Sequence, residues 1–388
     1  MTEGNGLRLR LALLVAAVSG GTARHVAALA DGCSRAGLAV SGYGPPSTRR
    51  LFGPAAAFTP VNITDRPRPA RDVVALARLR RALRAARPDV VHAHGVRAGA
   101  FAALALAGWR EQGRRQQGRR QQGPRPALAV TVHNGPPAGR LNRAVYAALE
   151  RVCARRADAV LCASADLVAR MRAAGAAGAE QFDVPAGPPE PPSPAAVARA
   201  AADIGANGRP VVLAVGRLAP QKGFDVLVAA ATRWASRDPA PRTVIAGSGP
   251  LAAQLADQAR RSGADVLLLG ERDDVPALLA QADVFVLPSR WEARALTLQE
   301  AMRAGRPVVA TAAGGTPDVT GKDAALLVPP GDAGALALAV LAVLDDAGLA
   351  ASLSRAGQAR AAAFPTEQDA VRQAGALYRR LAAARPGR

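Results

Sequence analysis

The chain has 388 residues and a formal net charge of +20, with 49% apolar and only 3% aromatic residues. This length favours two domains over one, and the apolar content excludes a largely disordered chain. The charge is uneven: residues 1–190 carry 28 basic and 12 acidic side chains, whereas residues 191–388 carry 22 and 18. A basic half favours an anionic partner, and a charge without specific meaning is the alternative. Because no nucleic-acid-binding motif or aromatic stacking surface accompanies it, a membrane surface or a phosphorylated acceptor is favoured over nucleic acid.

Short apolar runs alternate with amphipathic helical patterns along the whole chain. The predicted strands are 9–16, 39–43, 90–92, 127–132, 159–162, 211–215, 243–246, 266–269, 284–287, 308–310 and 326–328. The apolar run at 11–18 is too short to span a bilayer and lacks a signal-peptide cleavage pattern, so it is interpreted as the first buried strand. Buried strands that alternate with helices predict an α/β fold with parallel sheets covered on both faces.

Prolines crowd residues 183–209 and predict a linker near the middle of the chain. We therefore expect two Rossmann-like, doubly wound domains, residues 1–190 and 191–365, with a ligand cleft between the carboxyl ends of their sheets. The last helix, about residues 366–385, could pack back on the first domain, which the sequence leaves open.

Cys33, Cys153 and Cys162 are an odd number of cysteines without metal-ligand spacing. Buried free thiols in a reducing cytoplasm are the expected interpretation. Residues 110–123 read REQGRRQQGRRQQG, a basic repeat with no residue for a core. A tolerated expansion of a surface loop is favoured there, with contact to a membrane or an acceptor as the functional alternative. The expected location is cytoplasmic, with peripheral attachment to the inner face of the membrane left open.

The most informative segment is VGRLAPQKGF, residues 215–224, which follows a predicted strand and precedes a helix. Gly216 is expected to allow a tight turn, and Gly223 a close backbone approach at the start of the helix. Arg217 and Lys222 would then present two cations beside a helix N-terminus, an arrangement that suits a diphosphate. Lys222 is one of only two lysines, so the arginine-rich composition does not explain it. Two solvated surface cations are the alternative.

Two carboxylates, Glu292 and Glu300, flank the start of the helix predicted from Leu296. Glu292 is expected on the loop after the strand 284–287, and Glu300 about one turn into the helix. Each carboxylate can accept hydrogen bonds from two neighbouring hydroxyls, so the pair suits a hydroxyl-rich ligand. From these residues alone, a capping or surface role is an equal alternative.

All four histidines, His25, His92, His94 and His133, lie in the first predicted domain. His92 and His94 face one side of a strand end, but the sequence shows no third ligand with suitable spacing, so no metal is expected. Structural or acceptor-side roles are favoured for that pair. His133 follows a strand, which favours a ligand contact.

The order of VGRLAPQKG, GSGPL, PSRWEARALTLQEAM and AGRPVVATAAGGTPD resembles the C-terminal half of retaining GT-B glycosyltransferases of the family-4 class. SGGTARHVAALA, DVVHAHG and AVTVHN are similar to the N-terminal half of that class. The resemblance covers nearly the whole chain apart from the repeat and the proline linker. It implies a retaining, metal-independent transfer of a sugar from a nucleotide-diphospho-sugar to a hydroxyl acceptor. The nucleotide-sugar is then a substrate, and no cofactor is expected.

The resemblance also implies roles for particular residues. Arg217 and Lys222 match the donor diphosphate pair, Glu300 the acid that holds the ribose, and Glu292 the acid near the donor sugar. His133 matches a histidine near the reacting sugar, so the catalytic set is Arg217, Lys222, Glu292 and His133. Further residues match backbone segments around the donor, namely Gly20, Gly21, Gly216, Arg294, Ala295, Leu296 and Thr297.

Ala293 and Ala295 depart from the family pattern, in which many relatives have glycine at both positions. Their methyl groups are expected to narrow the sugar pocket, so the donor sugar is not specified. No side chain is a clear covalent nucleophile, and the resemblance implies front-face attack assisted by the departing phosphate. The acceptor is unnamed, with lipid-linked and phosphorylated molecules both open. A sugar-nucleotide 2-epimerase of the same architecture is the alternative function, and a non-catalytic binding protein is a more distant one.

Overall fold

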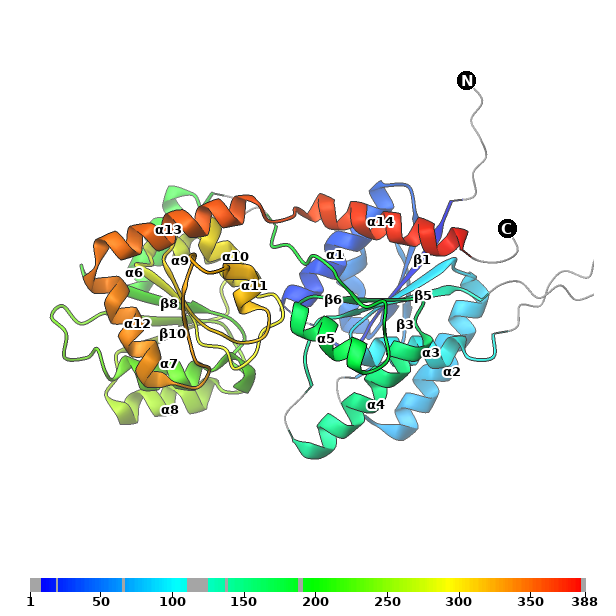
Figure 1. Ribbon diagram of the computed structural model, residues 1–388, viewed down its shortest axis with the longest axis horizontal. Helices are drawn as coiled ribbons and strands as arrows, with labels where there is room; N and C mark the ends of the chain where they lie inside the picture. Colours follow the sequence, from blue (N-terminus) through cyan, green and yellow to red (C-terminus); the bar gives the residue numbers. More distant parts are fainter. Residues whose placement is uncertain are drawn as a thin grey trace, which may run out of the picture. The chain divides into compact units, whose positions relative to one another are not determined.

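The computed structural model describes residues 8–18, 20–64, 67–109, 125–136, 139–187 and 191–384. The whole repeat (110–123), with Pro124, and part of the proline linker (188–190) lie outside these described residues. The chain divides into two compact units, each shown in Figure 1: unit 1 is Met1–Val184 with Glu367–Arg388, and unit 2 is Pro185–Thr366. The division falls after Val184, a few residues before the boundary expected from the prolines.

Unit 1 is built on a seven-stranded parallel sheet of order β3-β2-β1-β4-β5-β6-β7. Its strands are β1 (Arg10–Val15), β2 (Ala39–Gly44), β3 (Ala57–Pro60), β4 (Val90–His94), β5 (Ala127–Val132), β6 (Ala159–Cys162) and β7 (Glu180–Gln181). Its helices are α1 (Gly20–Arg35), η1 (Pro46–Phe52), α2 (Pro69–Ala86), α3 (Val96–Leu106), α4 (Arg140–Arg156), α5 (Ala165–Ala173) and α14 (Glu367–Ala383). The apolar pattern did not predict β3 and β7, which are short strands at the two edges of this sheet.

The last helix, α14, belongs to unit 1 although it follows all of unit 2 in sequence. It lies beside α1 on one face of the sheet, whereas α2, α3 and α4 lie on the other face (Figure 1). Leu377 and Tyr378 of α14 are buried in the same core as Leu11 and Leu13 of β1. Burial of this apolar stripe therefore holds the C-terminal helix on the first unit.

Unit 2 is built on a six-stranded parallel sheet of order β10-β9-β8-β11-β12-β13. Its strands are β8 (Val211–Val215), β9 (Arg242–Ala246), β10 (Val266–Gly270), β11 (Val284–Leu287), β12 (Val308–Thr311) and β13 (Leu326–Val328). Its helices are α6 (Pro194–Ile204), η2 (Pro220–Lys222), α7 (Phe224–Ala231), α8 (Ala252–Ser262), α9 (Val275–Gln281), α10 (Leu296–Arg303), α11 (Thr316–Thr320), α12 (Ala333–Asp345) and α13 (Ala347–Ala362). Leu213 packs into the core on one face of the sheet and Val212 into the core on the other, so both faces are covered, as expected from the continuous apolar strands.

Both units therefore have the doubly wound α/β architecture expected from the sequence. Within the described part of the chain, no single helix is both long and apolar enough to cross a membrane. The helices on either side of Asp346 meet that test only together, as a pair bent by 101°.

Candidate functional site

The strand order of unit 2 reverses between β8 and β11, which lie side by side in the sheet. The loop after β8 leads through the short turn η2 into α7, and the loop after β11 leads into α10. In open parallel sheets, ligands bind outside the carboxyl ends of the strands at such a reversal. Both segments selected from the sequence, 215–224 and 288–300, therefore lie at the position where this fold binds ligands.

Lys222 and Glu292 meet across these two loops. The Lys222 ammonium (Nζ) lies 2.5 Å from Glu292 Oε1, and the Glu292 side chain is only 7% exposed. The hydroxyl of Ser289, itself fully buried, donates a 2.7 Å hydrogen bond to the same oxygen. Two donors thus hold one buried carboxylate oxygen, one of them through a charge-assisted bond.

Arg290 and Asp225 fasten the two loops to each other. The Arg290 guanidinium donates to both carboxylate oxygens of Asp225, at 2.7 and 2.6 Å, and to the Pro220 carbonyl at 3.0 Å. The Arg290 amide donates to the Gln221 carbonyl, and the Gln221 side chain donates to the Trp291 carbonyl. Hydrogen bonds from Arg290 hold the pKa of the Asp225 carboxyl below its ordinary value. The position of Glu292 relative to Lys222 is therefore set by several bonds besides their own.

Two glycines allow the backbone to pack this closely. Gly223 has φ +66°, and a Cβ placed there would lie 2.0 Å from the Pro288 carbonyl oxygen. Gly314 has φ +56°, and a Cβ there would lie 2.0 Å from the carbonyl oxygen of Glu292. The expectation that Gly223 allows a close backbone approach at the start of the helix is confirmed. The tight-turn role expected for Gly216 is wrong, because φ is not positive there and a Cβ would make only ordinary contacts, at 3.5 Å or more.

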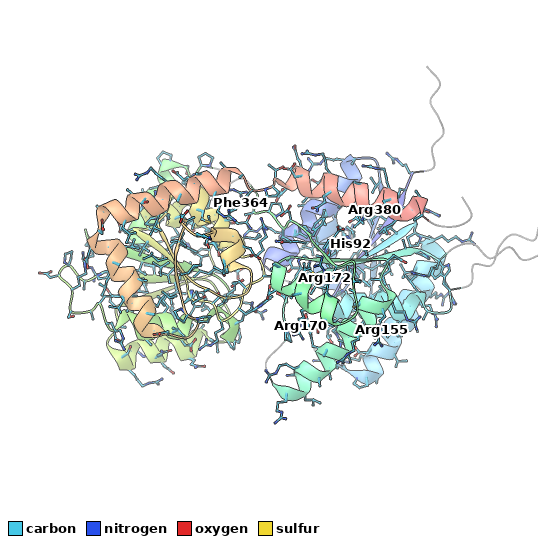
Figure 2. All side chains as sticks on the ribbon, in the orientation of Figure 1. His92, Arg155, Arg170, Arg172, Phe364 and Arg380 are labelled. Carbon is cyan, nitrogen blue, oxygen red and sulfur yellow. The ribbon has the colours of Figure 1, made fainter. Side chains whose placement is uncertain are left out.

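The helix α10 begins at Leu296, as predicted, and Glu292 lies on the loop before it. Ala295 precedes the helix without a side-chain cap, so the side chain at that position does not occupy the amide groups of the first turn. Thr297 and Glu300 are half-buried in the first and second turns. The Arg294 guanidinium lies over the ring of Phe364, 5.9 Å from the ring centroid; Phe364 is labelled in Figure 2.

Arg217 lies two residues after the end of β8 and is exposed. It forms no ion pair with any residue that the structure describes, in contrast to Lys222. Ala293 and Ala295, the two departures from the family pattern, are 7% and 6% exposed, so their methyl groups are packed against the surrounding protein.

In unit 1 the strand order reverses between β1 and β4. Gly20 and Gly21 begin α1 shortly after β1, His94 ends β4, and His133 comes directly after β5. These expected site residues therefore lie at the carboxyl ends of neighbouring strands, as the glycine turn and the motifs DVVHAHG and AVTVHN implied.

The four histidines form one buried cluster in unit 1. His94 Nδ1 lies 3.2 Å from His133 Nε2, and the ring of His25 is 5.8 and 5.5 Å from the rings of His94 and His133. Ring nitrogens of His25, His94 and His133 all lie within 4.8 Å of one another. Only His94 of the HAH pair belongs to this group of three, so the expectation that the pair lacks a third ligand is not contradicted. The third imidazole comes from α1, and sequence spacing does not reveal that approach.

His92 has a different environment from the other three. Its Nδ1 lies 2.6 Å from the hydroxyl of Tyr378, and its Nε2 lies 2.6 Å from the hydroxyl of Thr131 (Figure 2 labels His92). Its ring also packs against that of His94, with centroids 4.2 Å apart and the ring planes tilted by 37°. The C-terminal helix α14 therefore fixes the orientation of His92, which is a structural role of the kind the sequence favoured.

Burial lowers the pKa of every histidine in this cluster. The pKa of His92 falls to about 3 and that of His133 to about 4, mainly because burial penalises the charged ring. The pKa values of His25 and His94 fall well below the ordinary range through burial and through the neighbouring histidines. All four rings are therefore neutral at pH 7.

The three cysteines are free and buried, as expected. Burial raises the pKa of Cys33 to about 11 and the pKa values of Cys153 and Cys162 to about 12. Thiols that remain protonated at neutral pH are poor nucleophiles and poor metal ligands.

Sequence reasoning missed the residues that position Glu292. Ser289 binds its carboxylate, Thr311 donates to the Ser289 carbonyl at 2.5 Å, and the Gly315 amide donates to the Glu292 carbonyl at 2.8 Å. The motifs PSRWE and AGGTPD contain most of these residues, but only the pairing of β11 with β12 shows that the two segments meet.

Comparison with known proteins extends over both units. Residues 19–187 match the family model "Glycosyltransferase Family 4", and residues 209–346 match "Glycosyl transferases group 1". The chain is 34% identical to a 2-deoxystreptamine N-acetyl-D-glucosaminyltransferase from Streptomyces fradiae, over 54% of this chain and 52% of the relative. It is also 34% identical to a GDP-mannose-dependent alpha-(1-6)-phosphatidylinositol monomannoside mannosyltransferase from Mycolicibacterium smegmatis, over 43% and 47% of the two chains. The chain thus spans about half the length of these curated relatives.

Among solved structures, the fold is similar to that of a sucrose-phosphate synthase from Thermosynechococcus elongatus. The TM-score is 0.76 and the sequence identity 25%, with 97% of this chain and 100% of that chain covered.

Proposed function

This chain belongs to the GT-B glycosyltransferases, and we propose on that basis that it transfers a sugar from a nucleotide-diphospho-sugar to a hydroxyl acceptor with retention of anomeric configuration. The observation that carries this proposal is the contact of Lys222 with Glu292 at the strand-order reversal of unit 2. A cation for a phosphate and a carboxylate for hydroxyls stand side by side there. A nucleotide-diphospho-sugar presents both of these groups in adjacent positions.

In this proposal, Arg217 and Lys222 bind the diphosphate, together with the backbone amides at the start of α10. Amide groups at a helix start bind anions because they are unpaired donors at the positive end of the helix dipole. Two cations and these amides can neutralise the leaving diphosphate without a metal ion, so we propose a metal-independent transfer.

Glu292 is proposed to accept hydrogen bonds from hydroxyls of the donor sugar, and Glu300 from the ribose of the nucleotide. Glu292 is engaged by Lys222 and Ser289. Donor binding would therefore exchange partners: the ammonium turns to the diphosphate, and the carboxylate turns to a sugar hydroxyl.

The proposed reaction breaks the bond between the anomeric carbon and the diphosphate oxygen. The acceptor oxygen forms a bond to the same carbon from the same face, and its proton passes to the departing diphosphate. Arg217 and Lys222 stabilise the charge that develops on the leaving group. Removal of one such stabilising group typically lowers the rate by 10²–10³-fold. His133 is proposed to contact the reacting sugar as a neutral imidazole.

The acceptor is proposed to be a lipid-linked or phosphorylated hydroxyl compound handled at the inner face of the membrane. The basic first half of the chain supports an anionic partner. The name of the mycobacterial relative also includes a phosphatidylinositol acceptor. The relatives' names include N-acetylglucosaminyl and mannosyl transfer, so we propose only that the donor sugar is a hexose or a hexose derivative.

A donor screen tests the proposed function directly. UDP-, GDP- and ADP-sugars would be compared by thermal shift, since ligand at 100 times its dissociation constant stabilises a protein by about 2.7 kcal/mol. The donor that binds would then be incubated with candidate acceptors, and the anomeric configuration of the product determined by NMR. A product of inverted configuration would contradict the retaining mechanism. Conversion of the donor alone into a 2-epimer would support the epimerase instead.

A further inference from the structure

The chain passes between the two units at two places, and residues beside both places contact one helix of unit 2. The first connection enters unit 2 at Pro185, and the second leaves it after Thr366. The helix is α10, whose first turn and Glu300 are assigned to the donor in the proposed function. The contacting residues next to each connection, Ala186, Gly187 and Phe364, all belong to unit 2 itself.

Arg303 and Gln299 hold the first connection against α10. The Arg303 guanidinium donates hydrogen bonds from Nη1 to the carbonyl oxygens of Ala186 and Gly187, the second at 2.9 Å. The Ala186 amide in turn donates to Gln299 Oε1 at 3.2 Å, and both of these residues are buried. Gln299 and Arg303 are four residues apart, so they lie on the same face of the helix. Three hydrogen bonds, two of them charge-assisted, therefore fix residues 186 and 187 to α10.

Phe364 holds the second connection against the same helix. The guanidinium groups of Arg303 and Arg294 each lie over its ring, 5.9 Å from the centroid, an arrangement in which the cation is attracted to the aromatic face. The ring also packs against the apolar core that contains Leu298 and Met302 of α10. Arg303 therefore contacts both connections, the first through hydrogen bonds and the second through an aromatic ring.

Both connections contain a proline beside the point where the chain changes unit. Pro185 begins unit 2, and Pro365 stands between Phe364 and Thr366. Proline fixes its own φ and restricts the residue before it, so such segments are stiffer than ordinary linkers. A stiff segment transmits the orientation of the element to which it is tied. We propose that Arg303 is a positioning residue that ties both connections to α10 and thereby restricts the motion of one unit relative to the other.

The consequence for catalysis rests on the function proposed above. In that function, Arg217 and Lys222 of unit 2 bind the diphosphate, whereas His133 of unit 1 contacts the reacting sugar. Turnover thus needs residues of both units, while binding of free nucleoside diphosphate rests mainly on unit 2. Loss of Arg303 should therefore lower kcat far more than it lowers nucleotide affinity. A misplacement of about 1 Å, even from a change distant from the reacting atoms, costs about 10²-fold in rate.

Pulsed EPR distance measurements test the restricted motion without any substrate. Spin labels would be attached at Val73→Cys on α2 of unit 1 and at Leu338→Cys on α12 of unit 2, where the native side chains are 68% and 71% exposed. The native cysteines are buried thiols with raised pKa values, so they react slowly with the label. We expect a broader distribution of label distances in folded Arg303→Ala than in the labelled parent. Equal widths in the two proteins would overturn the proposal.

Arg306→Ala is the matched control. Arg306 lies three residues after Arg303 and is likewise half-buried, but the bonds that the structure describes for it run to the carbonyls of Ala304 and Ala282, both at 3.1 Å. Its removal should leave the distance distribution as narrow as in the parent. Equal broadening in Arg306→Ala and Arg303→Ala would overturn the assignment to Arg303. If Arg303→Ala does not fold, Arg303→Met replaces it, because methionine keeps an apolar chain and lacks the donors.

Kinetics distinguish positioning from a contribution to stability alone. Where the parent transfers sugar, Arg303→Ala should lower kcat by about 10–100-fold and leave the affinity for free nucleoside diphosphate nearly unchanged. Arg303→Lys should recover part of the loss, since it keeps the charge but not the planar guanidinium. Unchanged kcat in folded Arg303→Ala would overturn the positioning role. If the parent transfers no sugar from any donor, the proposed function is wrong, and the distance distributions still decide whether Arg303 restricts the two units.

Discussion

Lys222 and Glu292 are in direct contact, with 2.5 Å between the ammonium nitrogen and a carboxylate oxygen. The sequence assigned these residues to different parts of one donor molecule, the diphosphate and the sugar. Their contact means that each residue helps to position the other. It also means that binding must replace an existing ion pair, so the two residues are expected to be coupled energetically.

Variants of the two carboxylates should affect different parts of donor binding, the nucleotide for Glu300 and the sugar for Glu292. Glu300→Ala is expected to weaken binding of the free nucleoside diphosphate as well as that of the sugar donor, because Glu300 is assigned to the ribose. Glu292→Ala should impair use of the sugar donor while leaving the affinity for free nucleoside diphosphate unchanged or higher, since it releases Lys222 for the phosphates. Calorimetric titration of both variants measures this, and an equal loss of free-nucleotide affinity would contradict the division.

Gly223 and Gly216 should respond very differently to alanine. Gly223→Ala is expected to lower the free energy of unfolding by about 1–3 kcal/mol from its backbone conformation alone, and further through the 2.0 Å approach to the Pro288 carbonyl. Gly216→Ala should leave stability nearly unchanged, because its Cβ would meet only atoms at 3.5 Å or more. Urea unfolding of the two variants gives the comparison. Similar losses in both would show that the loop after β8 is not packed as described.

The buried histidines should make stability depend on pH. The pKa of His92 is lowered to about 3 and that of His133 to about 4, against 6.5 for an ordinary histidine. As pH falls below 6.5, only the unfolded chain takes up these protons, so the free energy of unfolding decreases by about 1.4 kcal/mol per pH unit for each such histidine. Unfolding in urea at pH 7, 6 and 5 measures the slope.

His92→Gln is the control for that slope. Its stability will be lower at every pH because two hydrogen bonds are lost, but the decline between pH 6.5 and 5 should be shallower than in the parent protein. An identical slope would mean that His92 is protonated in the folded protein at these pH values.

Much of the architecture could be predicted from the sequence because buried parallel strands consist of short runs of apolar residues. β5, β6, β8, β11 and β13 have the expected bounds, and α10 starts at the expected residue. The edge strands β3 and β7 were missed because each is short and one is polar. Apolar periodicity carries no signal for such strands.

Long-range contacts at the sites could not be predicted in the same way. The bonds of Ser289 and Arg290 depend on how two loops pack after β8 and β11, and the approach of His25 to His94 depends on α1 lying beside the ends of β4 and β5. A signal was available in the expected strand order, since parallel strands bring their carboxyl ends together. Residue types alone did not show which side chains meet there.

The basic half of the chain should bind anionic vesicles in a salt-sensitive manner. The repeat and its flank, residues 110–125, carry six arginines and one glutamate, and each basic residue near an anionic surface contributes about 1 kcal/mol. On α2, Val73 and Val74 are 68% exposed beside the exposed Arg71 and Arg78, which supports a surface contact. Co-sedimentation should weaken at high salt and after deletion of 110–125, while donor binding persists. If the protein does not bind anionic vesicles even at low salt, the prediction is wrong and the basic charge has another role.

The central claim is that Lys222 binds the donor diphosphate, and the affinity of free nucleoside diphosphate tests it most directly. Lys222→Ala would be compared with Lys322→Ala, which removes the chain's other lysine, an exposed one. UDP, GDP and ADP would each be titrated, and the nucleotide that binds the parent protein would be used for both variants. The account predicts a large loss of affinity, and a 10²–10³-fold loss of turnover with the sugar donor, in folded Lys222→Ala and neither loss in Lys322→Ala. Unchanged nucleotide affinity in a folded Lys222→Ala protein would contradict it.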